Sequence, residues 1–251
     1  MTDKPLLLVA GGLFYSYPGN ATPAINGVSF SLKRGELCGL IGPNGAGKTT
    51  LLSILTTLLA PQRGSLFFSG IDALRNPAGV RRKIGFVPQD LALYDRLSGL
   101  ENIRYFGRMY GLGGRLLAEK AKYYLDMFGL YENRARLVAT YSGGMKRRIN
   151  LIIGLIHDPE LLFLDEPTVG IDAQSRHLIL EKLAALNDQQ MAMVYTSHYL
   201  EEVQTLCRRV VIIDGGRVIA EDTPQNLIAQ ADGCDSLAEI FLQKTGEQLR
   251  E

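Results

Sequence analysis

The sequence has few cysteines, and no pattern that would pair them or bind a metal. Cys38, Cys207 and Cys234 lie far apart among the 251 residues, their number is odd, and no Cys-x-x-Cys occurs. These absences exclude a disulfide-stapled chain and give no signal for a zinc or redox motif. The simplest interpretation is three free thiols in a reducing cytosol.

Long apolar runs and an excess of charge of one sign are also absent. No stretch reaches the roughly 18 apolar residues that a membrane span needs, and the apolar segment Leu6–Ala10 is too short for a signal peptide. With 27 basic and 26 acidic side chains, the chain lacks the basic footprint of a general nucleic-acid binder. We expect a soluble chain that stays inside the cell, has no nucleic-acid partner, and can still dock on a membrane protein.

What is present is an alternation of strand-like and helix-like segments. Residues 161–164 form a continuous apolar run, which is typical of a strand buried on both faces. Further strands are predicted from short apolar or alternating segments at 28–32, 36–41, 66–68, 84–87, 191–196 and 210–213. Because helical patterns from residue 173 and over 199–206 separate the later strands, the sequence predicts an α/β fold with a largely parallel sheet.

The middle of the chain has a helical pattern instead. Apolar residues recur every three to four positions over 100–110 and again over 117–128, so we expect a helical insertion whose aromatic stripe, Tyr110 included, is helix core. Three basic runs, at 81–83, 146–148 and 208–209, are expected to be solvated faces.

A glycine-rich phosphate loop follows the strand at 36–41. It is Gly42-Pro43-Asn44-Gly45-Ala46-Gly47-Lys48-Thr49, followed by Thr50. It fits G-x-x-x-x-G-K-[ST] and is followed by an apolar helix, as this motif requires. Backbone N–H groups and the positive end of that helix bind phosphate, Lys48 adds charge at the β- and γ-phosphates, and the Thr49 hydroxyl can ligate Mg²⁺.

Two carboxylates end the buried strand at 161–164. In a parallel sheet ligands bind outside the carboxyl ends of the strands, the edge at which the phosphate loop also lies. Asp165 can therefore reach a Mg²⁺ ion held there. Glu166 follows it and points elsewhere, so it can polarise an attacking water.

Between these two motifs lies a helix start, Tyr141-Ser142-Gly143-Gly144-Met145. Alone, Ser142 would be interpreted as a simple N-cap. In this position the segment resembles the L-S-G-G-Q signature of the ATPase subunit of ABC transporters. Tyr replaces Leu at 141 and Met replaces Gln at 145, and the Met145 thioether cannot donate a hydrogen bond.

The resemblance covers nearly the whole chain and implies further site residues. Gln89 matches the family's Q-loop, Asp172 the D-loop and His198 the switch histidine. Tyr17 matches the aromatic residue that stacks on adenine, with Tyr15 as a near alternative. The implied fold is a P-loop NTPase core with a mainly parallel sheet, an N-terminal antiparallel β subdomain and an inserted helical subdomain.

The resemblance also implies one ABC ATPase domain over residues 1–251. Its expected parts are the catalytic core (1–89 and 158–222), the helical subdomain with the signature (90–157) and a short C-terminal helical tail (223–251). That tail is too short for a regulatory domain of the usual ~50 residues or more.

The implied cofactors are ATP and Mg²⁺. On the family pattern Lys48 neutralises phosphate charge, and Thr49, Gln89 and Asp165 hold the metal. Glu166 acts as general base or orients water, His198 and Gln89 sense the γ-phosphate, and Asp172 links two sites. The nucleotide is also contacted by Tyr17, by residues 42–50, and by Ser142, Gly143, Gly144 and Met145.

The implied partners are a second copy of the chain, or a paralogous ATPase, and a separate polytopic membrane permease. Two subunits meet head to tail, so that each signature covers the ATP of the other. The details resemble most the ABC-2 branch, which exports drugs, polysaccharides, lipid-linked sugars or ions. The expected location is therefore peripheral, on the cytoplasmic face of a bacterial cell membrane.

Three alternatives remain at this point. An importer ATPase has the same fold. A soluble ABC ATPase acting on DNA or ribosomes would usually show long coiled coils or two cassettes, whereas one cassette is present and no heptad run separates Lys48 from Ser142. A P-loop kinase or GTPase does not explain the Ser-Gly-Gly start, Gln89 and His198 together.

Overall fold

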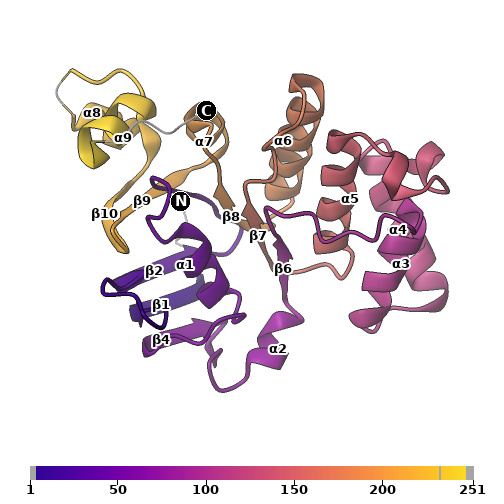
Figure 1. Ribbon diagram of the computed structural model, residues 1–251, viewed down its shortest axis with the longest axis horizontal. Helices are drawn as coiled ribbons and strands as arrows, with labels where there is room; N and C mark the ends of the chain where they lie inside the picture. Colours follow the sequence, from indigo (N-terminus) through magenta and orange to yellow (C-terminus); the bar gives the residue numbers. More distant parts are fainter. Residues whose placement is uncertain (1–3, 232, 247–251) are drawn as a thin grey trace.

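A computed structural model describes residues 4–231 and 233–246, and its strands form two sheets (Figure 1). The first sheet is antiparallel. Its strands, in spatial order, are β2 (Ile25–Lys33), β1 (Leu6–Tyr15), β4 (Arg63–Phe68) and β5 (Ile71–Asp72).

The second sheet is parallel except for one antiparallel edge strand, β10. In spatial order its strands are β10 (Arg217–Asp222), β9 (Arg209–Asp214), β3 (Leu37–Ile41), β8 (Ala192–Thr196), β7 (Leu161–Asp165) and β6 (Ile84–Val87). The predicted combination of a mainly parallel sheet with an N-terminal antiparallel β subdomain is therefore confirmed.

Three helices stand together beyond β6, at the right of Figure 1. They are α3 (Gly99–Met109), α4 (Gly114–Met127) and α5 (Gly143–Leu155). All three fall within the segment 90–157 that the sequence predicts as a helical subdomain, although the exact subdomain boundaries stay a prediction. Two 3-10 turns connect α4 to α5, namely η1 (Tyr131–Asn133) and η2 (Val138–Thr140).

The remaining helices are distributed around the sheets. They are α1 (Lys48–Leu55), α2 (Pro77–Arg81), α6 (Ala173–Asp188), α7 (Leu200–Leu206), α8 (Pro224–Ala229) and α9 (Leu237–Thr245). The last two lie in the predicted helical tail, of which residues 232 and 247–251 lie outside the described residues. Within the described part of the chain, every helix is too short or too polar to cross a bilayer.

Strand β7 shows how the parallel sheet separates two hydrophobic cores. Because side chains alternate along a strand, Leu161 and Phe163 pack with α1 and the antiparallel sheet. Leu162 and Leu164 pack with the helices on the other face. Burial on both faces explains the uninterrupted apolar run and holds Asp165, the last residue of the strand, in a fixed place at the sheet edge.

The strands predicted over 28–32, 36–41, 66–68, 84–87, 161–164, 191–196 and 210–213 are confirmed: they coincide with β2, β3, β4, β6, β7, β8 and β9 in whole or in part, with only residues 36 and 191 outside the observed strands. Strands β1, β10 and the two-residue β5 were not predicted from the sequence. Gly11 and Gly12 lie in the middle of β1 and suggest a turn, but the pairing with β2 shifts register there and Gly12 adopts φ +57°, so the strand continues through a bulge. Strand β10 is a half-exposed edge, which leaves little apolar signal.

Two expectations about side chains were wrong in part. Arg147 is only 9% exposed. Arg209 pairs with Glu36 and Glu221, each at 2.5 Å between nitrogen and oxygen. Neither arginine therefore belongs to a solvated face, contrary to the prediction for the basic runs.

Tyr110, which was predicted to lie in the helix core, is 39% exposed. Its ring stacks flat on the ring of His157, with ring centres 3.7 Å apart. Long side chains with a polar end can bury their stems, which residue type alone does not reveal.

Candidate functional site

The phosphate loop runs from the end of β3 to the start of α1. Two of its glycines are required by close packing: a Cβ on Gly42 would lie 2.2 Å from the carbonyl oxygen of Ile213, and one on Gly47 would lie 2.4 Å from that of Ala24. Gly47 also has φ +104° and caps α1 without a side-chain hydrogen bond. The first N–H groups of α1 are therefore left uncapped by this residue, in the geometry that binds an anion.

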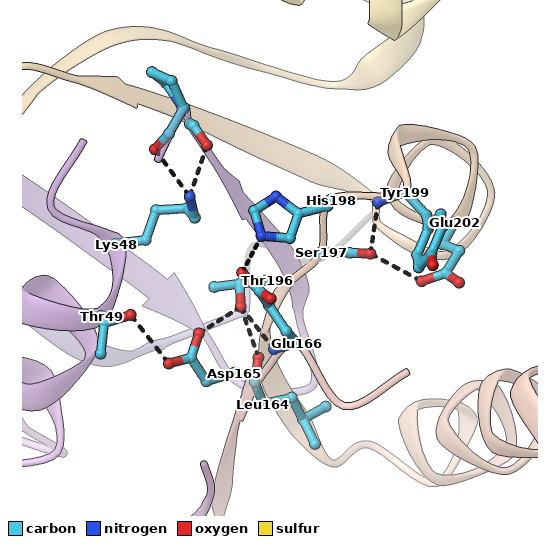
Figure 2. A network of polar contacts seen from close by, with 12 residues as sticks. Lys48, Thr49, Leu164, Asp165, Glu166, Thr196, Ser197, His198, Tyr199 and Glu202 are labelled. Carbon is cyan, nitrogen blue, oxygen red and sulfur yellow. Dashed lines mark hydrogen bonds and ion pairs between the residues drawn. The ribbon is translucent and has the colours of Figure 1, made fainter. Parts of the chain in front are cut away.

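Lys48 begins α1 and is buried. Its Nζ donates hydrogen bonds to the carbonyl oxygens of Gly42 and Pro43, at 2.7 and 3.0 Å (Figure 2). Burial lowers its pKa, while the nearby charges of Glu166 and Asp165 act in the opposite direction. The ammonium thus lies inside the loop that it would help to bind phosphate.

Asp165 lies opposite the start of α1, and both of its carboxylate oxygens accept hydrogen bonds. Thr49 Oγ1 donates to Oδ2 at 3.2 Å, and Thr196 Oγ1 donates to Oδ1 at 2.8 Å (Figure 2). Burial raises the pKa of this carboxyl, and the charge of Glu166 raises it further. The structure thus brings Thr49 and Asp165 together, while their role in holding Mg²⁺ stays a prediction.

Glu166 follows directly and adopts φ +49°, a region that non-glycine residues rarely occupy. Its N–H donates to Thr196 Oγ1 at 2.9 Å. Its Oε1 lies 2.6 Å from His198 Nε2, whereas Oε2 is buried without a hydrogen-bond partner among the described residues. Unpartnered buried oxygens and strained backbone are both features that gather at functional sites.

A cavity of about 420 Å³ joins these groups. Its walls include the phosphate loop, Glu166, Gln89, His198 and Tyr17. The Tyr17 hydroxyl lies 3.2 Å from Thr50 Oγ1. Tyr15 packs edge-on against Tyr17 but does not line the cavity, so the geometry favours Tyr17 of the two alternatives.

The signature residues have a different environment. Ser142 caps α5 by accepting a hydrogen bond from the N–H of Met145 at 3.3 Å, and it is exposed. Met145 packs its side chain against the core of its own chain. Gly144 lies against the start of α6, where a Cβ would be 2.2 Å from Ser175 Oγ. In the described structure this helix start is not part of the cavity.

Asp172 caps α6 next to that helix start. Its Oδ1 accepts a hydrogen bond from the N–H of Ser175 at 2.8 Å. This bond lowers the pKa of the Asp172 carboxyl, so the side chain is anionic at neutral pH. Like Ser142, Asp172 is exposed and lies outside the cavity of its own chain.

The signature helix holds the Gln89 loop in place. Arg147 Nη1 donates to the backbone oxygen of Gln89, and Asn150 Nδ2 donates to that of Pro88 at 3.3 Å. The fully buried Asn102 binds both the N–H and the carbonyl of Tyr94, at 2.9 and 3.0 Å. These bonds set the entry of the chain into the helical segment.

The residues predicted to hold Mg²⁺ fit such an ion. A hydroxyl from Thr49, a carboxylate from Asp165 and an amide from Gln89 are hard oxygen donors, and Mg²⁺ is usually bound through one or two carboxylates together with substrate phosphates. The buried and unpartnered Oε2 of Glu166 adds negative charge that a cation would offset. No cluster of three or more His, Cys, Asp or Glu side chains able to hold a metal by itself occurs within 4–231 and 233–246.

Several residues of the site were not predicted from the sequence. Thr196 pairs with Asp165 across the sheet. Its hydroxyl connects the Asp165 carboxylate to the backbone N–H of Glu166, and no spacing in the sequence indicates this. The loop after β1 contributes Asn20, Thr22, Pro23 and Ala24 to the cavity wall; its only signal is a turn composition.

Comparison with known proteins agrees with this geometry. Residues 25–169 match the ABC transporter family model. The chain is 45% identical over 223 residues, 89% of its length and 71% of the relative's, to the linearmycin resistance ATP-binding protein LnrL of Bacillus subtilis. It is 42% identical over 221 residues, 88% and 67% of the two lengths, to the Nod factor export ATP-binding protein I of Cupriavidus pinatubonensis.

Among solved structures, an ATP binding subunit of an ABC transporter superposes with a TM-score of 0.85 at 29% identity, covering 95% of this chain and 99% of that one. The match to the family model covers more than half of the chain, and it includes both the phosphate loop and the Asp165–Glu166 pair. The chain therefore belongs to the ABC transporter family of ATP-binding ATPase subunits.

Proposed function

We propose that this chain hydrolyses ATP to drive export through a separate polytopic membrane permease. The observation that carries the proposal is the separation of two groups within one chain. The cavity unites Lys48, Glu166, Gln89 and His198, while the capped helix start at Ser142 is exposed and takes no part in that cavity.

This separation favours a head-to-tail pair of subunits. A two-fold interface would apply the Ser142 helix start of one subunit to the cavity of the other, and would do so twice. The N-terminus of α5 offers N–H donors and a positive dipole end to a γ-phosphate. Asp172, anionic and next to that start, is assigned to connect the two cavities. The second subunit is another copy of the chain or a paralogous ATPase.

The cavity residues suggest how water attacks the γ-phosphorus to release ADP and phosphate. Lys48 would exchange its bonds to two loop carbonyls for bonds to phosphate oxygens. His198 occupies one oxygen of Glu166, which leaves Oε2 to accept a hydrogen bond from the attacking water and to draw its proton. Gln89 and His198 would sense the γ-phosphate, and Tyr17 would stack on adenine.

Thr49, Asp165 and Gln89 would hold Mg²⁺ at the phosphates. When bound, the ion neutralises charge on the β- and γ-phosphate oxygens. The chain's own contribution is to fix these donors: Asp165 is oriented by Thr196 and Gln89 by the backbone bond to Arg147.

Export as the direction of transport is supported by the relatives, one named for antibiotic resistance and one for export. A permease docked beside the Gln89 loop and the helical segment would hold the chain at the cytoplasmic face of a bacterial membrane, as a peripheral subunit.

A nucleotide-trapped dimer tests the catalytic part. We expect Glu166→Gln to bind ATP but to lose turnover by about 10²–10⁴-fold, since the general base is removed, and to elute as a dimer with ATP in gel filtration. Hydrolysis at nearly the wild-type rate would refute the role of Glu166.

Affinity purification of the tagged chain from detergent-solubilised membranes tests the transport part. We expect a polytopic membrane protein in roughly stoichiometric amount, and its sequence would narrow the exported substrate. Recovery with ribosomes or nucleic acid instead would refute the exporter, and would leave the ATPase chemistry standing.

A further inference from the structure

Glu202 is a buried carboxylate outside the cavity. It lies in the first turn of α7 and is 7% exposed. Its Oε2 accepts hydrogen bonds from three hydroxyl groups: those of Tyr195, of Thr168 at 2.9 Å and of Ser197 at 3.0 Å (Figure 2 shows the last). Burying a carboxylate is costly unless it is well partnered, so such a group calls for an explanation beyond packing.

The three hydroxyl donors come from the two segments that carry the reactive side chains. Thr168 lies two residues after Glu166, and Ser197 directly precedes His198. Ser197 Oγ also accepts the N–H of Tyr199 at 3.0 Å, so the backbone is held on both sides of His198. The hydrogen bonds of Glu202 thus connect the turn after β7 to the turn after β8.

A third segment reaches the other oxygen of Glu202. Arg176, four residues after Asp172 in α6, lies with Nε 3.5 Å from Glu202 Oε1. Its guanidinium also stacks on the ring of Tyr199, 3.8 Å from the ring centre. The carboxylate therefore has a cationic neighbour, and the start of α6 is held in the same cluster.

We propose that Glu202 is a positioning residue for ATP hydrolysis. It acts through Thr168 and Ser197 to hold the side chains of Glu166 and His198 in position relative to each other. Glu202 does not line the cavity, so it would act through other residues and not by contact with the nucleotide or the attacking water. This inference rests on the proposed roles of Glu166 and His198. It adds that the 2.6 Å contact between them depends on a carboxylate on a third element.

Steady-state kinetics of Glu202→Gln tests the proposal. The amide keeps the shape but loses the charge that faces Arg176 and the hydroxyl groups. We expect kcat to fall about 10- to 100-fold, the cost of a small misplacement of reacting groups, while KM for ATP changes less than about twofold because the phosphate loop is untouched. An unchanged kcat would overturn the proposal.

The matched control is Glu201→Gln, the same change in the preceding, exposed residue of α7, which we expect to leave kcat at the wild-type value. Should Glu202→Gln fold poorly, Ser197→Ala removes one donor with a smaller change. We expect Ser197→Ala to lower kcat with little change in KM as well. A lower melting temperature with unchanged kcat per folded molecule would assign the cluster to stability alone and refute the proposal.

A double-mutant cycle with His198→Ala separates positioning from a general defect. If Glu202 acts through His198, Glu202→Gln will add little to the loss already caused by His198→Ala; additive losses would contradict the proposal. The outcome is distinct from failure of the proposed function, in which Glu166→Gln itself would leave hydrolysis unchanged.

Discussion

Two helix starts in this molecule are both suited to bind a phosphate, and they differ in how complete they are. At the start of α1, Gly47 provides no side-chain cap, and Lys48 lies close to the charges of Asp165 and Glu166. At the start of α5, Ser142 caps its own helix through the N–H of Met145, and the surface in front of it is open.

This difference suggests that the start of α1 can bind nucleotide without a second subunit, whereas the start of α5 would need one. At the start of α1, the charged side chains and the hydrogen-bond donors all belong to one chain, so the site is formed before a ligand binds. The α5 start is stable without nucleotide because its cap satisfies part of the helix end. In the proposed pair of subunits, it would contribute only when the second subunit brings a phosphate to it. Four substitutions test this comparison.

Lys48→Ala should have the largest effect. Removing a buried cation that lies inside the phosphate loop, near the charges of Glu166 and Asp165, should weaken ATP binding by about 2–5 kcal/mol, in the isolated monomer as well as in the pair. Titration with a fluorescent ATP analogue measures this directly. Unchanged affinity would show that the α1 start is not the nucleotide site.

Gly144→Ala should destabilise the α5 start. The new methyl group would lie 2.2 Å from Oγ and 2.6 Å from Cβ of Ser175, an overlap that costs about 1–3 kcal/mol. Gly143→Ala is the matched control, since its nearest neighbour would be Gly170 O at 3.5 Å, an ordinary contact. Urea denaturation of both variants gives the comparison; equal stabilities would contradict the tight packing of α5 on α6.

Ser142→Ala should distinguish the contribution of Ser142 to folding stability from its contribution to dimerisation. We expect a loss of about 1 kcal/mol in unfolding free energy from the missing cap, unchanged ATP binding by the monomer, and weaker ATP-dependent dimerisation. Ser236→Ala is a close control, because Ser236 caps α9 with the same 3.3 Å bond to a backbone N–H. If both variants dimerise equally well, Ser142 does not face the partner's nucleotide.

Met145→Gln should have the smallest effect. The Met145 side chain packs against its own core but is only half-buried, so an amide at this position can still reach water. Introducing the glutamine of the family signature should change stability by about 1 kcal/mol or less and should leave kcat nearly unchanged. A large gain in kcat would show that this side chain reaches the nucleotide after all.

Much of the site follows from the sequence because its motifs are continuous segments. The phosphate loop, the Asp165–Glu166 pair and the strand that carries the pair each depend on local spacing, and the apolar run of β7 records burial on both faces. The fold class could be predicted for the same reason, since strands buried in a parallel sheet differ plainly in pattern from the helices between them.

The rest depends on contacts between segments that are distant in the chain. Thr196 reaches Asp165 only because β8 pairs with β7 in one register. Glu201 and Glu202 are identical residues side by side, and only the direction in which α7 packs decides which one is buried. Arg147 belongs to a basic run whose other members contact different neighbours. Residue type and spacing carry none of this information.

The bond from Arg147 to the Gln89 loop has a consequence for a pair of subunits. Together with the bond from Asn150 to Pro88, it connects the Gln89 loop, which borders one cavity, to the start of α5, which would face the other cavity. The loop and the helix start would then move together. A change that shifts Gln89 in one cavity would then shift the Ser142 start over the other. Because such coupling is reciprocal for binding, ATP in either cavity should change the ATP affinity of the other by the same factor. A Hill coefficient for ATP equal to that of independent sites would contradict this coupling.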